Sequence, residues 1–294
     1  MPELPEVETT KTSLTPLLGQ SVQAVTVFQP KLRWTMPDDL AQLAGYTLAS
    51  VERRAKYLLL NFLPLLENLP TQKLIIHLGM SGSLQQHPYG TDKRKHDHLI
   101  LVFQDHGNGA SMQLHYHDPR RFGAVLWFAD YSHKLLDHLG PEPLSTDFSS
   151  DYLYHLIQRT ETSNPASRRK PRPITRSIKS VIMEQQVVVG VGNIYATESL
   201  YLAGIHPAMP AYQLSYAQIA LLVEHIKTIL QKAIQLGGST LRDFTVASGQ
   251  TGYFQQTLHV YGKQGQICPK CATPLDNIKI TGRASVFCPN CQAL

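Results

Sequence analysis

The first half of the chain alternates apolar and polar residues in short segments that turn residues separate. The segments are rich in β-branched and aromatic side chains, and each is five or six residues long. Alternation with a period of two places one face of a β-strand against a core. The segments cover 22–27, 57–62, 73–78, 99–103, 112–117 and 123–128. Six such strands predict a β-sandwich.

A helix is predicted before the first strand. Val7, Leu14 and Leu17 fall on one loosely helical face, and Gly19 can end the helix. Pro5 suits the first helical position, where a missing backbone N–H costs nothing. This helix would carry the N-terminus of the chain to its site.

The second half is predicted to be largely helical. From residue 131 the alternation stops, and 140–144, Gly-Pro-Glu-Pro-Leu, has the composition of a linker. From Val187 the sequence predicts the end of an apolar helix, a glycine turn, and a new helix that Asn193 caps. Ser215 begins an amphipathic helix with apolar residues every three or four positions, and Gly237 ends it.

Two Cys-x-x-Cys pairs close the chain. Sixteen residues separate the pair Cys268 and Cys271 from the pair Cys288 and Cys291. This spacing predicts a zinc site in which four thiolates fill every tetrahedral position, so that the metal holds a hairpin and binds no substrate. Arg283 lies between the pairs, at the tip or flank of the predicted hairpin.

The composition fits a soluble protein with ordinary cores. The 294 residues are 43% apolar, and 27 Lys and Arg against 22 Asp and Glu give a formal charge of +5, which is compatible with binding a polyanion. The longest apolar runs, such as 58–66, are too short to cross a membrane, and Asn61 and Pro64 interrupt this one. Because no signal-like segment is present, the protein is expected to be cytoplasmic.

Pro2 stands directly behind the initiator methionine and beside Glu3. Removal of Met1 would make Pro2 the N-terminus, and an α-amino group has a reference pKa of about 7.7–8.0, against about 10.4 for lysine. More of this amine is therefore neutral and nucleophilic near pH 7. A secondary amine that attacks a sugar carbon gives an iminium, which acts as an electron sink for elimination. In the alternative interpretation, Pro2 and Pro5 only mark the start of a helix.

Lys56, Met80 and Phe122 are further candidates. Lys56 stands at the head of the predicted strand 53–60 and either extends into solvent or serves a buried anionic site as a proton carrier. Met80 and Phe122 lie in glycine-flanked loops, and Phe122 follows two arginines. They are either core residues or wedges that enter a base stack.

Four histidines lie near the predicted strands. His96 and His98 follow the basic run 93–95, whereas His115 and His117 occupy alternate positions of a strand. A metal site is not favoured, because no cysteine or carboxylate cluster completes it. His96 is better placed to contact a phosphate.

Taken in order, the motifs resemble those of the bacterial formamidopyrimidine-DNA glycosylase family (Fpg/MutM), and the resemblance covers nearly the whole chain. The matching segments are Pro2-Glu-Leu-Pro-Glu-Val-Glu8, Arg54-Ala-Lys-Tyr57, His77-Leu-Gly-Met-Ser-Gly82, Lys95-His-Asp-His98, Asp118-Pro-Arg-Arg-Phe-Gly123, Val189-Gly-Val-Gly-Asn-Ile-Tyr195 and the four-cysteine finger with Arg283.

The resemblance implies an α+β, multidomain fold. Its parts are an N-terminal β-sandwich with flanking helices, a helical helix-two-turn-helix domain and a C-terminal Cys₄ zinc finger. We assign 1–131 to the sandwich, 132–148 to a linker, 149–252 to the helix-two-turn-helix domain with a lesion-capping loop, and 253–294 to the finger.

The resemblance also implies a monomeric DNA glycosylase and abasic-site lyase of base excision repair, which acts on damaged duplex DNA. The implied substrates are 8-oxoguanine and formamidopyrimidines, and β,δ-elimination would follow removal of the base. Pro2 would be the nucleophile and Glu3 the proton donor to the sugar ring oxygen. Lys56 would donate a proton in β-elimination and Arg283 in δ-elimination.

Other matching residues would bind DNA or metal. His96, Arg120 and Asn193 match DNA-contacting positions, while Met80, Arg120 and Phe122 match the residues that fill the gap left by an extruded base. The four cysteines would hold one structural Zn²⁺ per chain.

The segment 164–173 departs from the family pattern. It is a basic, proline-rich insertion, and the DNA contact expected nearby cannot be assigned to a residue. Two alternatives stay open: an endonuclease VIII type that removes oxidised pyrimidines, and a zinc-finger DNA-binding protein without catalysis. Leu4 and the loop 120–122 favour the purine-specific type, and the non-catalytic alternative leaves Pro2 and Lys56 unexplained.

Overall fold

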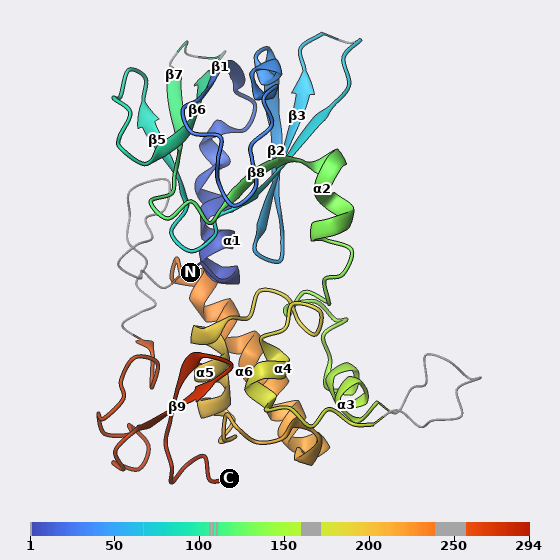
Figure 1. The fold of residues 1–294 in the computed structure, drawn as a ribbon, viewed down its shortest axis with the longest axis vertical. Coiled ribbons are helices and arrows are strands. Elements are labelled where there is room, and N and C mark those ends of the chain that lie inside the picture. The colour runs from blue at the N-terminus through green and yellow to red at the C-terminus, as the bar shows by residue number, and fades with distance from the viewer. Residues whose placement is uncertain are drawn as a thin grey trace, which may run out of the picture. The chain divides into compact units, whose positions relative to one another are not determined.

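The structure is a computed structural model, and it describes residues 2–66, 68–105, 107, 109, 111–159, 172–238 and 257–294. The chain divides into two compact units (Figure 1). Unit 1 contains Met1–His138 and Ile234–Gln255, and unit 2 contains Leu139–Ala233 and Gln256–Leu294. Within the described ranges, no helix is long and apolar enough to cross a membrane.

Unit 1 is built around antiparallel strands. They are β1 (Ser21–Val27), β2 (Tyr46–Arg54), β3 (Tyr57–Pro64), β4 (Gln72–His77), β5 (Ser83–Pro88), β6 (Asp97–Gln104), β7 (Ser111–His117) and β8 (Ala124–Trp127). Hydrogen bonds join them in the order β5-β7-β6-β1-β2-β3-β4-β8. β1 and β2 share a single residue pair, Ser21 with Thr47, whereas β1–β6 and β2–β3 pair over most of their lengths. The sheet therefore bends between β1 and β2 into two layers of four strands each.

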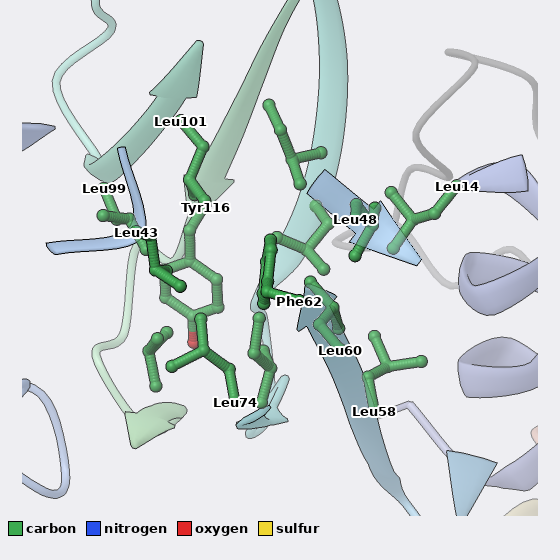
Figure 2. Packing of buried hydrophobic residues seen from close by; sticks show 14 of the residues in the cluster. Leu14, Leu43, Leu48, Leu58, Leu60, Phe62, Leu74, Leu99, Leu101 and Tyr116 are labelled. Carbon is green, nitrogen blue, oxygen red and sulfur yellow. The ribbon is translucent and has the colours of Figure 1, made fainter. Parts of the chain in front are cut away.

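The core of unit 1 lies between these two layers. Leu99, Leu101 and Tyr116 come from one layer, and Leu60 and Phe62 come from the other (Figure 2). All five are at most 1% exposed. Removal of this apolar surface from water is what holds the layers together. The predicted β-sandwich is confirmed.

Six of the eight strands described in unit 1 match predicted segments, whereas β2 and β5 were not predicted. β5 reads Ser-Leu-Gln-Gln-His-Pro and β2 ends in Glu-Arg-Arg, so neither has the apolar content of a typical strand. The predicted strand 53–60 was wrong, because Ala55 takes a left-handed φ of 55° and β3 begins only at Tyr57. Ala55 and Lys56 instead form the tight turn of the β2–β3 hairpin.

Helix α1 (Leu4–Ser13) begins one residue earlier than predicted, so that Pro5 occupies the second helical position. The helix packs against β2 and β3 (Figure 1). The prediction that Gly19 ends this helix was wrong, because α1 ends at Ser13, and Gly19, with a φ of 80°, lies six residues further on. The remaining helices of this part are η1 (Thr15–Leu17), η2 (Leu40–Leu43) and α2 (Phe128–Leu135), of which α2 begins inside the predicted last strand.

Unit 2 is largely helical, as predicted. Its helices within the described ranges are α3 (Ser150–Gln158), α4 (Ile178–Ile182), α5 (Asn193–Leu202), η3 (Ala211–Gln213) and α6 (Tyr216–Gln235), and the last two residues of α6 belong to unit 1. α6 follows Ser215 as predicted, and the Ser215 hydroxyl accepts the backbone N–H of Gln218 at 3.3 Å. The buried face of α6 consists of Ile219, Leu222, Val223, Ile226, Ile229, Leu230 and Ala233.

The segment before α5 differs from the prediction. Residues 187–189 are buried valines, but they lie in turns and bends and not at the end of a helix. Gly192, not Asn193, is the N-cap of α5, because its carbonyl accepts the backbone N–H of Ala196 at 3.0 Å. Asn193 is therefore the first helical residue, and its side chain makes no capping bond.

The last part of unit 2 is a hairpin of β9 (Asp276–Ile280) and β10 (Arg283–Phe287). Thr281 and Gly282 form its turn, with φ values of 47° and 76°. A small core packs beneath it and contains Tyr201, Val260, Cys268, Leu275, Val286 and Cys288. The hairpin thus has its own apolar support in addition to the cysteines.

Two predicted segments lie almost wholly outside the described residues. The structure describes only 172–173 of the basic insertion 164–173. It does not describe 239–252, the end of the segment 149–252 that was assigned the lesion-capping loop. The domain boundaries assigned from the sequence stay a prediction.

Phe62 and Leu63 provide a matched test of the sandwich core. Phe62 is 0% exposed, whereas Leu63 is 48% exposed. We expect Phe62→Ala to lower the free energy of unfolding by about 3–5 kcal/mol, because it removes buried contacts and leaves a cavity. Leu63→Ala should change it by less than about 1 kcal/mol. Urea denaturation measures both, and equal losses would contradict the assignment of Phe62 to the core.

Candidate functional site

The N-terminal residues of unit 1 are buried. Pro2 is buried, Glu3 is 3% exposed, and Glu6 is 2% exposed. The Glu3 backbone N–H donates to Glu6 Oε2 at 2.9 Å and so closes the first turn of α1. Gly238, the last described residue before 239–256, lies against the same carboxylate, since a Cβ there would be 3.2 Å from Glu6 Oε1. Pro2 and Glu3 are therefore held in place and shielded from water.

An arginine joins α1 to the turn that carries Lys56. Arg53 Nε lies 2.5 Å from Glu8 Oε2 on the helix, and Arg53 Nη1 donates to the Ala55 carbonyl at 3.0 Å. Burial raises the pKa of Glu8, but hydrogen bonds from Lys11 and Arg53 outweigh burial and lower it overall. Lys56 is only 8% exposed, which excludes the interpretation that it extends into solvent.

His77 is an electrostatic neighbour of Lys56. Burial, and then the charges of Lys56 and Arg33, lower the pKa of His77 to about 4, so its ring is neutral at pH 7. His77 Nδ1 accepts the Gly79 backbone N–H at 3.1 Å, and its ring centre lies 4.9 Å from that of Tyr57. A neutral His77 adds no competing positive charge beside Lys56.

The loops that carry Met80 and Phe122 touch each other. A Cβ at Gly79 would lie 2.4 Å from the Phe122 carbonyl carbon, so only glycine allows this approach. Met80 is 37% exposed and Phe122 is 44% exposed, which excludes the interpretation of both as core residues. The Arg120 guanidinium carbon lies 5.0 Å from the centre of the Phe122 ring. Exposed apolar side chains beside an arginine suit insertion into a base stack.

A buried carboxylate that the sequence analysis missed holds both loops. Asp118 is 0% exposed and accepts hydrogen bonds from Ser81 Oγ at 2.8 Å and from the Gly123 backbone N–H at 2.9 Å. Ser81 Oγ in turn accepts the Arg120 backbone N–H at 3.2 Å. An aspartate before a proline is common in ordinary turns, so the sequence alone carries little signal for this role.

His96 lies at the surface beside a buried polar network. Its ring centre is 5.9 Å from that of His117 and 6.5 Å from that of His98. Partial burial and the charges of His117 and Lys95 lower the pKa of His96. His117 Nδ1 is bonded to Asp97 Oδ1 at 2.8 Å, so His117 belongs to the network, and His96 beside it is partly exposed.

Asn193 is the candidate DNA contact of unit 2. Its Oδ1 is buried and has no hydrogen-bond partner among the described residues. As the first residue of α5, it stands at a helix N-terminus, where backbone N–H groups and the helix dipole favour an anion. The side-chain amide is thus not committed to capping the helix.

The four cysteines of unit 2 fit a tetrahedral metal. Their Sγ atoms all lie within 4.8 Å of one another, with Cys268 to Cys291 at 3.9 Å and Cys271 to Cys288 at 3.4 Å. Zn–S bonds of about 2.3 Å require Sγ atoms about 3.8 Å apart. The cysteines are not joined by disulfides. Four thiols at these separations match the donor set of structural zinc.

Arg283 is the exposed first residue of β10, and a buried lysine supports its strand. Lys179 on α4 is 1% exposed, and its Nζ donates to the Ala284 carbonyl at 3.1 Å and to Ser285 Oγ at 2.7 Å. It also donates to Thr197 Oγ1 on α5 at 2.9 Å. No role was predicted for Lys179, because its only signal in the sequence is a single charge within an apolar segment.

Two family models match the chain. Residues 1–125 match the formamidopyrimidine-DNA glycosylase N-terminal domain, and residues 139–245 match the formamidopyrimidine-DNA glycosylase H2TH domain. The first range contains the buried Pro2, Lys56 and the two joined loops. The second contains Asn193 and the helices around it.

Similar proteins cover the chain along its full length. The formamidopyrimidine-DNA glycosylase of Psychrobacter arcticus is 67% identical over 308 residues, covering 100% of this chain and 99% of the relative. That of Acinetobacter baylyi is 53% identical over 295 residues, with 100% and 99% covered.

Solved structures of Lactococcus lactis Fpg are also similar. Its complex with abasic site-containing DNA has a TM-score of 0.83 at 35% identity, covering 99% of this chain and 100% of that one. The wild-type complex with DNA that contains N7-benzyl-Fapy-dG has a TM-score of 0.84 at 36% identity, with 100% of both chains covered.

His77 should couple the stability of unit 1 to pH. Because its pKa of about 4 in the fold lies below the unfolded value of 6.5, the unfolded chain binds more protons between these values. The contribution of neutral His77 to the free energy of unfolding is therefore fully present above pH 6.5 and is lost as the pH drops toward 4. His77→Gln can still accept the Gly79 N–H but does not titrate. We expect this variant to lose about 2–3 kcal/mol less stability than wild type between pH 7 and pH 4.

Urea denaturation at pH 7, 5.5 and 4 measures this effect. His133→Gln, on the exposed side of α2, serves as the matched control and should leave the pH dependence as in wild type. If His77→Gln loses as much stability on acidification as wild type, the depressed pKa is not the cause.

Proposed function

The chain belongs to the formamidopyrimidine-DNA glycosylase family of DNA repair enzymes, and we propose that it removes oxidised purines from duplex DNA and then cleaves the strand at the abasic site. The proposed lesions are 8-oxoguanine and formamidopyrimidines. Lactococcus lactis Fpg, a structural neighbour, is solved with DNA that contains an abasic site, which supports a DNA partner for this chain. Family membership disfavours a non-catalytic DNA-binding protein.

The observation that carries the proposal is the setting of Pro2. This residue is buried beside the buried Glu3 at the start of α1, and Arg53 ties that helix to the turn of the buried Lys56. After removal of Met1, unit 1 would hold a secondary amine, a carboxyl group and an ammonium group in fixed places. These are the groups that amine catalysis at a sugar requires.

In the proposed first steps, the Pro2 nitrogen bonds to C1′ of the damaged nucleotide while the bond from C1′ to the base breaks. The base leaves with the electron pair of that bond and is protonated. The nitrogen then loses its own proton, and its lone pair forms the C=N bond as the C1′–O4′ bond breaks. Glu3 gives its proton to O4′, so the products are an iminium on Pro2 and a hydroxyl on the opened sugar.

Strand cleavage follows from the iminium. Withdrawal of electrons into the C=N bond makes the C2′ proton acidic, and its loss expels the 3′ phosphate. A second elimination expels the 5′ phosphate. We assign Lys56 as the proton donor in the first elimination and Arg283 in the second, where their positive charges also stabilise the departing phosphates.

The damaged nucleotide must leave the duplex before Pro2 can reach its sugar. Extrusion costs a few kcal/mol, and side chains that fill the gap offset it. Met80 and Phe122, with Arg120 beside the Phe122 ring, are exposed on joined loops and are assigned this role. His96 and Asn193 are assigned to the DNA backbone.

We assign the four cysteines to one structural Zn²⁺. The metal would supply folding free energy to the hairpin that carries Arg283, and since all four positions are thiolates, it would offer none to substrate. Lys179 and the small apolar core hold the same hairpin from below.

Borohydride trapping tests the proposed function. Incubation with abasic duplex DNA and borohydride should reduce the iminium to a stable protein–DNA adduct, and Pro2→Gly should lower the yield at least tenfold because it replaces the secondary amine. Pro5→Ala, also buried on α1, is the control and should trap like wild type. Equal trapping by Pro2→Gly, or by a form that retains Met1, would place the nucleophile elsewhere.

Loss of a metal ligand should weaken DNA binding without affecting the sandwich. We expect Cys271→Ser to reduce bound zinc from one ion per chain to none and DNA affinity at least tenfold, because structural zinc contributes about 10–16 kcal/mol of folding free energy in finger peptides. Ala272→Gly, at a neighbouring exposed position with a φ of 59°, keeps all four thiols and serves as the control. Metal analysis and binding titration report both, and full affinity in metal-free protein would refute the assignment.

A further inference from the structure

A solvent-accessible pocket of about 350 Å³ lies in unit 1, and His96 is one of the residues that line it. Three segments line it: the end of β1 with Phe28, the loop with Lys93 and Lys95, and the loop after Asp118 with Arg121. None of Phe28, Lys93, Lys95 and Arg121 has a role in the function proposed above. The pocket borders the loop that also carries the exposed Phe122.

Of the three basic residues 93–95, only Arg94 bonds to the buried carboxylate of Asp97. Arg94 turns to Asp97, donating from Nε at 3.1 Å, from Nη2 at 3.0 Å and from its backbone N–H at 2.9 Å. Asp97 is 0% exposed, and His115 Nδ1 and His117 Nδ1 bond to it at 2.9 and 2.8 Å. These bonds hold the pKa of Asp97 well below its usual range, so the carboxylate stays charged and keeps the loop closed.

Arg94 neutralises the negative charge of Asp97, so this carboxylate does not cancel the positive charges of the other cations at the pocket. In the part of the chain that the structure describes, no carboxylate lies within ion-pair distance of Lys93, Lys95 or Arg121. Lys93 Nζ instead donates to the Arg94 carbonyl at 3.2 Å and lies 5.2 Å from the ring centre of Phe28. Three positive charges therefore surround one small pocket open to solvent.

The backbone of Arg121 also indicates a built site. Arg121 has a φ of 55°, a left-handed conformation that costs free energy for a residue with a Cβ. The Arg121 backbone N–H donates to the Asp118 carbonyl at 3.2 Å, and Asp118 itself is locked between Ser81 and Gly123. The fold thus holds Arg121 at the pocket at a local energetic cost.

We propose that this pocket is a phosphate site in which Lys93, Lys95 and Arg121 join His96 and bind one phosphodiester group of the DNA next to the position that the Phe122 loop occupies. The proposal rests on the proposed function, because it takes duplex DNA as the partner. A phosphodiester fits because it is a small anion that accepts hydrogen bonds from several donors. Phe28 serves the site by holding Lys93 over its ring.

The test compares Lys93→Gln/Lys95→Gln with a matched control. Lys134 lies 5.7 Å from the ring centre of Tyr131 and so has a similar cation–aromatic contact, but it does not line the pocket. Affinity for a duplex with a stable abasic-site analogue is measured from 50 to 200 mM salt. We expect the double variant to lower the salt slope by about 0.9, which is one phosphate contact, and the affinity at 100 mM by about tenfold. Lys134→Gln should match wild type.

A scan with single methylphosphonate linkages then locates the contact. Each duplex carries one uncharged linkage, and the wild-type protein should lose about tenfold in affinity at a linkage close to the lesion. At that same linkage the double variant should lose almost nothing, because the removed charges and the removed phosphate form one contact. If every linkage costs both proteins equally, the lysines act only through the general field of the surface, and the phosphate site is refuted.

Failure of this proposal can be told apart from failure of the proposed function. Binding to the analogue involves no chemistry, whereas borohydride trapping reports the Pro2 iminium. Normal trapping without a coupled linkage overturns the phosphate site alone. Absence of trapping by wild-type protein overturns the proposed function.

Discussion

The contact on which the candidate site depends is the double link made by Arg53. One guanidinium joins Glu8 on α1 to the Ala55 carbonyl in the β2–β3 turn. Pro2 at the start of that helix and Lys56 in that turn come from segments far apart in the sequence, and neither could be placed by local structure alone. With the link in place, the start of the helix beside Pro2 and the turn that carries Lys56 belong to one rigid frame, and the proposed catalysis requires such preorganisation.

A second kind of link holds several loops of the structure: a buried carboxylate accepts hydrogen bonds from the loop. Asp118 binds the two loops that carry Met80 and Phe122, and Asp97 binds the loop before β6. In unit 2, Glu198 accepts the backbone N–H groups of His259, Val260 and Tyr261 at 2.7–2.8 Å, just before the cysteine hairpin. Charge-assisted bonds to a buried anion are stronger than neutral ones, so loops that lack regular structure can still be rigid.

The sequence predicted those features that depend on residues close together in the chain. Alternation located the core strands, and the cysteine spacing located four thiols that do converge. β2 and β5 were not predicted, because a polar strand forms through pairing with neighbouring strands, which its own composition does not reveal. The cap of α5 was misplaced by one residue, since Gly192 and Asn193 are both acceptable caps and only the backbone bond from Ala196 distinguishes them. The roles of Asp118 and Lys179 depend on partners that only the fold brings near.

Some lysines and arginines bond to acceptors within the protein, whereas others are left to bind a partner. The net charge of +5 counts both groups and therefore says little about DNA binding. Lys179 is 1% exposed and gives its hydrogen bonds to Thr197, Ala284 and Ser285, so its charge supports the fold of unit 2. Arg53 and Arg94 are likewise directed to carboxylates within the protein. A cation can bind a phosphate only where the protein leaves some of its N–H donors unused, and the position of a cation in the fold, not the number of cations, decides this.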